Sequence, residues 1–499
     1  MKNAVGGLAV KACSILSAFV TRTIFLYILG IEYAGISTVF TDVLTVLSFA
    51  ELGIGTAITY ALYKPIAQND EEQICRLMGV YQKIYTAIAA TIFLLGLCFI
   101  PFLECVIKDA PDISEDVRLI YFLFLINTTV SYLLVYKSTF LTAAQKDYVV
   151  SKLRLIFTLV RTTVECLMLV ITRNYVAYLV LSIGLSIIQN YTIAKAAERE
   201  YPVLKIKSSG KLRPDEKRKL IQDTKALALY KVSGTILNGT DSILTASILG
   251  TVSAGMLGNY NLITSQVYNF IMKLFDATAA SVGNLAATTD REHQYAVFRQ
   301  MLFIGFWIYC FCSTCLWTLL NPFVHVWQGG KYLLGDYVVA LMVIEFYIKG
   351  LLSPVTQFRT SNGLFVQGRY RPLIMSIINI FVSIVLAHRL GIAGIILGTV
   401  ISRAVTQLWY DPWLIYKKVF NKSVNDYFRI YSQYLLVTVA CCLITSQLLN
   451  LLCPQEGVMK ILVGLALCIL IPNTTIVFLY HNNELFRRIG SLIKKMLHA

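Results

Sequence analysis

"FVTRTIFLYILG" (residues 19–30) places one arginine, Arg22, in a run that is otherwise apolar enough for the interior of a lipid bilayer. The apolar character extends back to residue 4, which exceeds the roughly 20 residues that a helix needs to cross the hydrocarbon core. A charge at the bilayer centre costs roughly 3 kcal/mol, so such charges usually face protein or a water-filled cavity. The stretch predicts a membrane helix with a cavity-facing guanidinium, and raises the question of what that guanidinium binds.

The composition extends this interpretation to the whole chain. Of its 499 residues, 57% are hydrophobic and only 14% are charged, and the mean hydropathy is +0.65, which excludes a soluble globular protein. We therefore expect an all-α polytopic membrane protein. The net charge of +16 is explained by basic cytoplasmic loops, so no nucleic-acid partner is expected. The twelve cysteines lie mostly in apolar runs without zinc-ligand spacing, and we expect no metal site.

Apolar windows separated by polar breaks predict about fourteen transmembrane helices. The polar segment 198–225 divides them into a six-helix lobe (1–197) and a second six-helix lobe (226–416), followed by two extra helices and a basic tail (417–499). Basic residues are concentrated in 198–225, just after residue 416 and in the tail, whereas the loops predicted on the other side of the membrane contain few. By the positive-inside rule, the linker and both termini are expected in the cytoplasm.

A weak internal repeat accompanies this division. "ILGIEYAG" (28–35) follows the first predicted helix and "ILGTVSAG" (248–255) follows the seventh, and the two motifs are identical at Ile-Leu-Gly and Ala-Gly. An even number of helices separates the copies, so the two would share one orientation and be related by an axis along the membrane normal. Five matches among small or apolar residues are also compatible with chance.

Further charges lie inside the predicted helices. Lys11 precedes Arg22 by eleven residues, close to three helical turns, so both lie on one face of the first helix. Arg22 has no acid one turn away on its own helix. The seventh predicted helix carries a similar polar stripe, with Lys231 along one face and Asp241 at its edge. Such stripes in both halves are what a central hydrophilic cavity requires, although Lys11 and Lys231 also lie close enough to helix ends to reach the interface.

A purely structural interpretation stays open for most of the other charges. Arg161 has Glu165 four residues beyond it, so this acid alone can neutralise it. The same applies to Lys273 with Asp276 and to Glu345 with Lys349, either of which can be an internal ion pair. By contrast, Glu51 and Arg403 have no partner within one turn of their own helices.

The first hundred residues resemble a known family. "LGIEYAGI" (29–36), "FAELGIGTA" (49–57) and "LYKPIA" (62–67), preceded by the basic residue Arg22, are similar to the opening region of Wzx-type polysaccharide flippases of the MOP superfamily, which also includes lipid II flippases and MATE drug exporters. In the rest of the chain, the resemblance rests only on the number of predicted transmembrane helices, the basic linker and "LGIAGIILGTVIS" (390–402). It implies a MATE-like fold, a bacterial cytoplasmic membrane location, and no enzyme activity or cofactor.

The resemblance also implies a substrate. Such flippases move undecaprenyl-pyrophosphate-linked oligosaccharide from the inner to the outer leaflet by alternating access, with membrane lipids around them and polysaccharide polymerase and chain-length proteins as candidate partners. Arg22 occupies a position that contributes to the cationic cavity in lipid II flippases, which carry further arginines in their second helix. Here that helix holds Asp42 and Glu51 instead, which argues against lipid II as the substrate.

The candidate residues follow from this comparison. The substrate-binding cations are Arg22, with Lys273, Arg161 and Arg403 as hypothetical second cations, and the acids that could couple transport to an ion are Asp241 and Glu51. The alternatives are a MATE-type cation-coupled drug exporter, a lipid II-type flippase and a non-transporting membrane scaffold of an envelope-synthesis complex, whose charges would be paired inside the bundle. The excess of intramembrane cations over isolated acids disfavours the drug exporter, which would bind cations through acidic residues.

Overall fold

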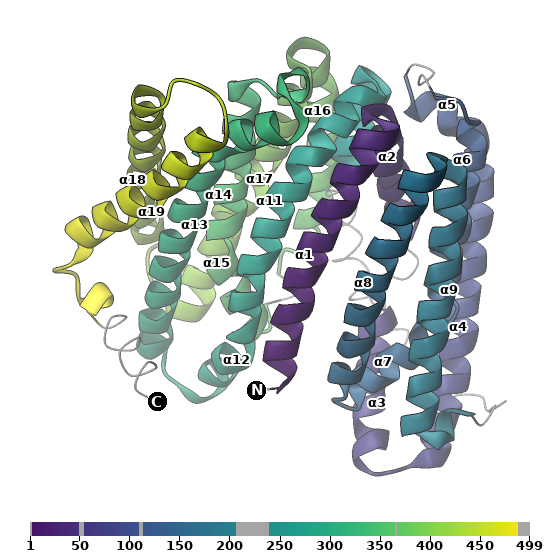
Figure 1. Cartoon of the computed structure of the whole chain (residues 1–499). Coiled ribbons are helices and arrows are strands. Elements are labelled where there is room, and N and C mark those ends of the chain that lie inside the picture. The colour runs from purple at the N-terminus through teal and green to yellow at the C-terminus, as the bar shows by residue number, and fades with distance from the viewer. Residues whose placement is uncertain (1, 49–53, 109–112, 206–238, 365–366, 488–499) are drawn as a thin grey trace. The chain divides into compact units, whose positions relative to one another are not determined.

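The computed structural model describes residues 2–48, 54–108, 113–205, 239–364 and 367–487, and these residues form helices and connecting turns without a strand. The chain divides into two compact units, Met1–Gly258 and Asn259–Ala499. The boundary lies inside one helix, α11, which is labelled in Figure 1. The lobe boundaries expected at 197, 225 and 416 remain predictions, because part of the linker lies outside the described residues. Lys2 already lies in the first helix, which ends at Leu29.

The first unit is a bundle of helices in which α1 packs along α8 and α9 packs against α6 and α8. Its helices are α1 (Lys2–Leu29), α2 (Ile31–Leu47), α3 (Ile54–Ala67), α4 (Glu71–Phe99), α5 (Leu103–Val106), α6 (Val117–Tyr132), α7 (Val135–Ala143), α8 (Asp147–Thr172) and α9 (Tyr175–Glu200), followed by a helix that ends at residue 249. The start of α11 (Thr251–Ala277), up to Gly258, also belongs to this unit, and the rest of α11 belongs to the second.

The second unit is built around the 38-residue helix α13, against which α14, α18 and α19 pack. Its helices are α12 (Ala279–Thr288), α13 (Arg291–Gln328), α14 (Asp336–Leu351), α15 (Ser353–Ser361), α16 (Arg371–Leu390), α17 (Ile392–Ile415), α18 (Val424–Leu452) and α19 (Val458–Tyr480), and a π-helical turn, Tyr416–Phe420, continues α17.

Side-chain caps begin several of these helices. The carboxylate of Asp70 accepts a hydrogen bond from the Gln73 amide at 2.9 Å, and Asp116, Asn174 and Asp290 act in the same way on α6, α9 and α13. Each cap satisfies one amide that has no partner within the helix. The caps at Asp116 and Asn174 coincide with the helix starts that the sequence predicts at 117 and 175. The helices capped by Asp70 and Asp290 begin well before the predicted starts at 79 and 298, because their first turns are polar.

Three predicted spans are each divided into two helices. The apolar windows of the sequence predict continuous helices over 117–144, 256–287 and 336–358. In the structure the first breaks between Tyr132 and Val135, the second at Thr278 and the third at Leu352. The last break has a clear cause, because Pro354 has no amide hydrogen to continue the helical hydrogen bonds. The first two breaks occur at residues that carry no helix-breaking signal in the sequence.

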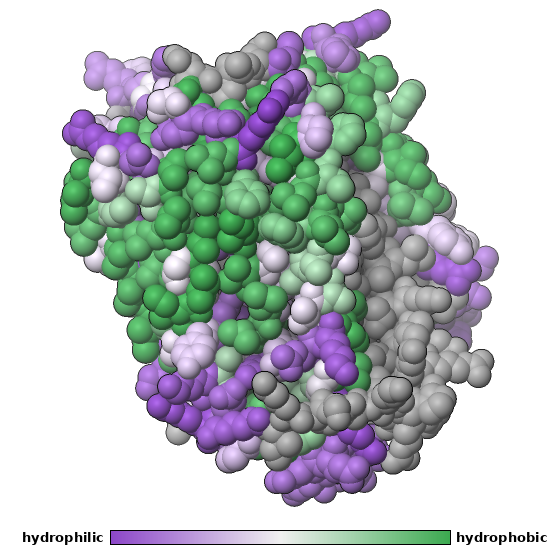
Figure 2. All heavy atoms as spheres, turned by 90° about the vertical axis from the view of Figure 1, so that its right-hand side faces the viewer, coloured by the Kyte–Doolittle hydropathy of each residue, from purple (hydrophilic) through white to green (hydrophobic). Residues whose placement is uncertain are grey.

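Ten helices among the described residues are long and apolar enough to cross a membrane. Many of their large apolar side chains are exposed, for example Leu94 on α4, Ile171 on α8 and Leu436 on α18. The face shown in Figure 2 is largely hydrophobic between hydrophilic ends. This distribution suits a surface in contact with lipid tails, so the chain is a multi-pass membrane protein.

The tightest helix pair of the second unit is α16 with α17. Gly391 turns the chain between them with a φ of +60°. The amide of Asn379 donates to the Thr399 hydroxyl at 2.7 Å, and the Ser383 hydroxyl donates to the Ile395 carbonyl at 3.0 Å. A Cβ atom at Gly398 would lie 2.2 Å from the Ser383 oxygen. Glycine at this position therefore lets the two helices approach closely enough to form these bonds.

We expect Gly398→Val to destabilise the protein by about 1–3 kcal/mol, because the side chain would force α16 away from α17. Thermal unfolding in detergent measures this change. The matched control is Gly283→Val on α12, where an added Cβ meets no atom within 4 Å. Equal melting temperatures for the two variants would contradict the close approach.

Candidate functional site

Arg22 lies where three helices of the first unit meet. It is on α1, two turns before that helix ends, and Gly30, with a φ of +92°, directs the chain into α2. The Arg22 side chain is half-buried, and its Nη1 donates to the carbonyl of Ala34 on α2 at 3.4 Å. A Cβ at Gly258 on α11 would lie 3.4 Å from Nη2. The guanidinium thus contacts α2 and the glycine-lined backbone of α11.

An aromatic cluster extends from this position. The Phe25 ring meets the rings of Tyr175 and Tyr178 edge to face at centroid distances of 5.3 and 5.9 Å, and Tyr33 meets Tyr175 at 5.3 Å. Tyr175 and Tyr178 lie close to the Arg22 guanidinium. Rings of this kind present flat apolar faces and hydroxyls together.

One edge of the cluster reaches an acid in the loop before α6. The Tyr33 hydroxyl donates to the Glu115 carboxylate and lies 3.3 Å from the Ser114 hydroxyl. Partial burial alone would raise the pKa of Glu115, but the hydrogen bonds from the Tyr33 and Ser114 side chains, together with main-chain hydrogen bonds at Glu115 and Tyr175, lower that pKa below its ordinary value. Glu115 is therefore ionised at neutral pH and fixes the outer end of the cluster.

Arg161 forms the ion pair that its spacing indicated. Its Nε lies 2.7 Å from the Glu165 carboxylate, and its Nη2 donates to the Ser182 hydroxyl on α9. Tyr178 donates to the second oxygen of Glu165 at 3.3 Å. Arg161 is thus part of a local hydrogen-bonded network that joins α8 to α9. Its role as a second substrate-binding cation remains a prediction.

Arg403 has an acidic partner on another helix of the second unit. Its Nη2 lies 2.8 Å from Glu345 on α14, and its Nη1 donates to Gln407 at 3.0 Å. Glu345 therefore contacts Arg403, while the Lys349 ammonium lies 4.3 Å from the centroid of the Tyr268 ring. Sequence spacing on one helix could not reveal this pair, because its two members come from α14 and α17.

The structure gives fewer close side-chain contacts for two further candidates, Lys273 and Asp241. Lys273 lies 3.7 Å from Asp276, and both side chains are more than half exposed, which makes a weak pair. Asp241 is half-buried in the helix 239–249, and its main-chain carbonyl accepts a hydrogen bond from Thr245 at 2.7 Å. Their roles in substrate binding and ion coupling remain predictions.

Three of the predicted charges fall outside the described part of the chain. Glu51 and Lys231 lie outside the described residues, as does the side chain of Lys11. Within the described ranges, no group of three metal-ligating side chains is found.

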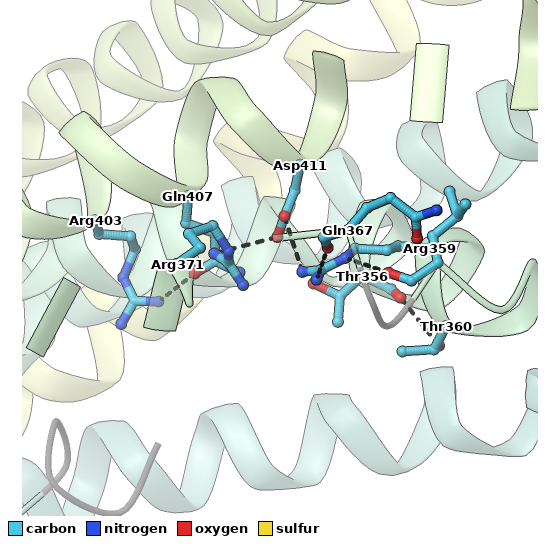
Figure 3. A network of polar contacts seen from close by, with 9 residues as sticks. Thr356, Arg359, Thr360, Gln367, Arg371, Arg403, Gln407 and Asp411 are labelled. Carbon is cyan, nitrogen blue, oxygen red and sulfur yellow. Dashed lines mark hydrogen bonds and ion pairs between the residues drawn. The ribbon is translucent and has the colours of Figure 1, made fainter. Parts of the chain in front are cut away.

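A buried network in the second unit was missed from the sequence (Figure 3). The Asp411 carboxylate on α17 lies 3.0 Å from Nη1 of Arg359 and 3.3 Å from Nη1 of Arg371. Arg359 also donates to the carbonyls of Leu364 at 3.2 Å and Gln367 at 2.9 Å. Even Arg371, the most exposed of the three charged side chains, is only 9% exposed. The network attaches the segment that connects α15 to α16 to helix α17.

The sequence did carry a signal for this network. "YDPW" (410–413) places an acid beside a proline in an apolar run, and "RTSNGLFVQGRYR" (359–371) is rich in arginine. Only the fold brings these two segments together, because they lie far apart in the chain. The contacts of Arg359 with two loop carbonyls indicate that this network holds the connection in place.

We expect Asp411→Asn to destabilise the protein by about 3–5 kcal/mol, because the substitution leaves two buried arginines without their acid. Thermal unfolding and the yield of folded protein in detergent measure this. The matched control is Asp276→Asn, which breaks an exposed pair and should cost less than about 1 kcal/mol. Equal effects would show that Asp411 does not hold the connection.

Comparison with solved structures identifies the fold. The structure is similar to an inward closed conformation of the lipid II flippase MurJ, with a TM-score of 0.69, 13% identity, and 96% of this chain and 98% of that chain covered. It is also similar to an inward-facing multidrug resistance MATE family transporter of the MOP superfamily, with a TM-score of 0.61, 13% identity, and 81% and 97% covered.

A mutant form of the Vibrio cholerae MATE transporter VcmN gives a TM-score of 0.54 at 14% identity, with 84% of this chain and 98% of that chain covered. No protein-family model and no curated relative matches the sequence. At these identities the similarity establishes the fold, and the expectation of a MATE-like all-α membrane protein is confirmed.

Proposed function

We propose that this protein is a flippase that moves an undecaprenyl-pyrophosphate-linked oligosaccharide, the repeat unit of a surface polysaccharide, across the bacterial cytoplasmic membrane by alternating access. The observation that carries the proposal is the near-complete similarity to a lipid II flippase, over 96% of this chain. The MATE transporter of the second comparison leaves about a fifth of the chain uncovered.

Arg22 supports the assignment because of the chemistry of such a substrate. The diphosphate must pass a region of low dielectric constant, while the lipid tail can remain in the bilayer. A guanidinium can hold two phosphate oxygens through parallel N–H bonds, and this attraction is stronger away from bulk water. Tyr178 lies near Arg22 and is only partly buried, so its ring and hydroxyl could take part in binding the glycan, whereas Tyr175 is fully buried and supports the cluster.

The two transporter alternatives differ from this proposal in their substrates. A MATE-type drug exporter would need acids for cationic drugs, and α2 offers Asp42 for that purpose. A lipid II-type flippase would need more cations near Arg22, yet α2 contains no lysine or arginine. A glycan attached to the same lipid pyrophosphate fits a site with one arginine and several tyrosines.

The first prediction of this proposal concerns Arg22→Ala. Loss of the charge-assisted bonds to pyrophosphate, worth about 1.5–3 kcal/mol, should reduce flipping about 10- to 100-fold while the protein level stays normal. Arg22→Lys should retain part of the activity, because lysine keeps the charge without the fork of parallel donors. The measurement is flipping of a defined lipid-linked oligosaccharide in proteoliposomes, with surface glycan as the cellular readout.

Arg118→Ala is the matched control, because Arg118 pairs with Glu104 at an exposed position of the same unit. It should flip substrate as the parent protein does. Unchanged flipping by Arg22→Ala would remove Arg22 from the site. If the parent protein exports a cationic dye but flips no lipid-linked sugar, the MATE-type drug exporter is favoured. If it flips lipid II alone, the lipid II-type flippase is favoured.

A second prediction concerns the energy source. With the cell interior negative, outward movement of a net anion gains about 2.3 kcal/mol per charge per 100 mV. We expect flipping in proteoliposomes to rise when a potassium diffusion potential of the matching sign is imposed. If collapse of the potential leaves the rate unchanged while a proton or sodium gradient alters it, coupling through Asp241 or Glu51 becomes the better account, and Asp241→Asn tests it.

A further inference from the structure

The two copies of the repeated motif contact each other in the first unit, backbone to backbone. A Cβ atom at Gly35 would lie 2.0 Å from the Thr251 carbonyl oxygen, and one at Gly255 would lie 2.6 Å from the Ile31 carbonyl oxygen. When the two motifs are aligned, Ile31 corresponds to Thr251 and Gly35 corresponds to Gly255. The contact is therefore reciprocal, as it would be around an approximate two-fold axis.

The turns before the two contacting helices have the same conformation. Gly30 has a φ of +92° and its amide donates to the Leu26 carbonyl at 3.1 Å; Gly250 has a φ of +91° and its amide donates to the Ala246 carbonyl at 3.1 Å. Leu26 and Ala246 also correspond to each other in the alignment of the two copies. Five sequence identities thus correspond to a repeated structural unit, a helix, a glycine turn and a second helix.

The chemistry of this contact suits a surface that separates and closes again. It is made by main-chain atoms in the first turns of α2 and α11, next to the glycine turns. Amides and carbonyls within helices satisfy one another along each helix, so parting the two helices leaves few polar groups without partners. The buried Asp411 network of the second unit is the opposite case, because opening it would separate charges.

Arg22 touches both sides of this contact. Its Nη1 bonds the carbonyl of Ala34, the residue before Gly35, and its Nη2 lies against Gly258, close to one helical turn beyond Gly255. A ligand oxygen that accepts hydrogen bonds from Arg22 would therefore compete with the Ala34 carbonyl. A ligand held by Arg22 would thus act at a side chain that lies beside both helices of the crossing.

We propose that the Gly35–Gly255 crossing is the outer gate of the transporter and is closed in this conformation. We further propose that pyrophosphate binding to Arg22 changes the contacts of this side chain with α2 and α11 and so opens the gate. This inference rests on the proposed function and on the predicted orientation, which places the glycine turns on the outer side. Pyrophosphate draws Arg22 away from Ala34, the crossing of α2 and α11 opens, and the substrate leaves outward.

The first test changes the glycines. Gly35→Ala and Gly255→Ala each place a methyl group against a carbonyl of the opposite helix. We expect either variant to lower flipping about tenfold or more by preventing closure of the gate, at a normal protein level. The control is Gly184→Ala on α9, where an added Cβ meets nothing within 4 Å. Flipping by both gate variants at the control rate would overturn the proposal.

The second test closes the gate covalently and does not depend on how well the alanine variants fold. A Cβ at Gly258 would lie 3.2 Å from the Thr38 methyl carbon, so Thr38→Cys with Gly258→Cys places two thiols within disulfide reach. Oxidation with copper phenanthroline and dioxygen should form the disulfide and abolish flipping, and dithiothreitol should restore it. Peptide mass spectrometry identifies this disulfide among those of the native cysteines.

The controls are the two single-cysteine variants, which should flip equally before and after oxidation. If the cross-linked double variant flips as fast as its reduced form, the crossing is static packing and the gate is refuted. That outcome leaves the proposed function intact, because the reduced protein still flips. A parent protein that flips no lipid-linked sugar would instead refute the proposed function.

Discussion

The cost of placing charge inside an apolar bundle determines much of this structure. The buried guanidinium groups of the described helices are met by the protein itself, with an acid, a carbonyl or an aromatic ring. Arg161 lies against Glu165, Arg403 against Glu345, and Arg359 against Asp411. The acids join these arginines to neighbouring helices or turns, whereas the printed hydrogen bond of Arg22 goes to a main-chain carbonyl, that of Ala34.

The amino-acid sequence predicted the all-α membrane fold and the Arg161–Glu165 pair, because these depend on composition and on spacing along one helix. It did not predict the partner of Arg403 or the Arg359–Asp411–Arg371 network, since these contacts join residues on different helices, far apart in the chain. The breaks at Tyr132 and Thr278 were missed for a related reason, because their residues are compatible with a continuous helix.

The repeat illustrates how little sequence a structural symmetry needs. Only five identities mark the repeat, and three of them are glycine or alanine, whose small or absent side chains allow close packing. Glycine at 35 and 255 permits contact between main chains, and glycine at 30 and 250 permits a positive φ. Positions with no such steric requirement have no reason to match, so the similarity is confined to the two short motifs.

The length of α13 has a consequence for how this protein meets its lipid surroundings. Its 38 residues extend about 57 Å at 1.5 Å per residue, well beyond a hydrocarbon layer about 30 Å thick. Part of the helix must therefore stand in the headgroup region or in water. Its first turns carry Arg291, Glu292 and Arg299, so this end of the helix has charged side chains that suit contact with headgroups or water.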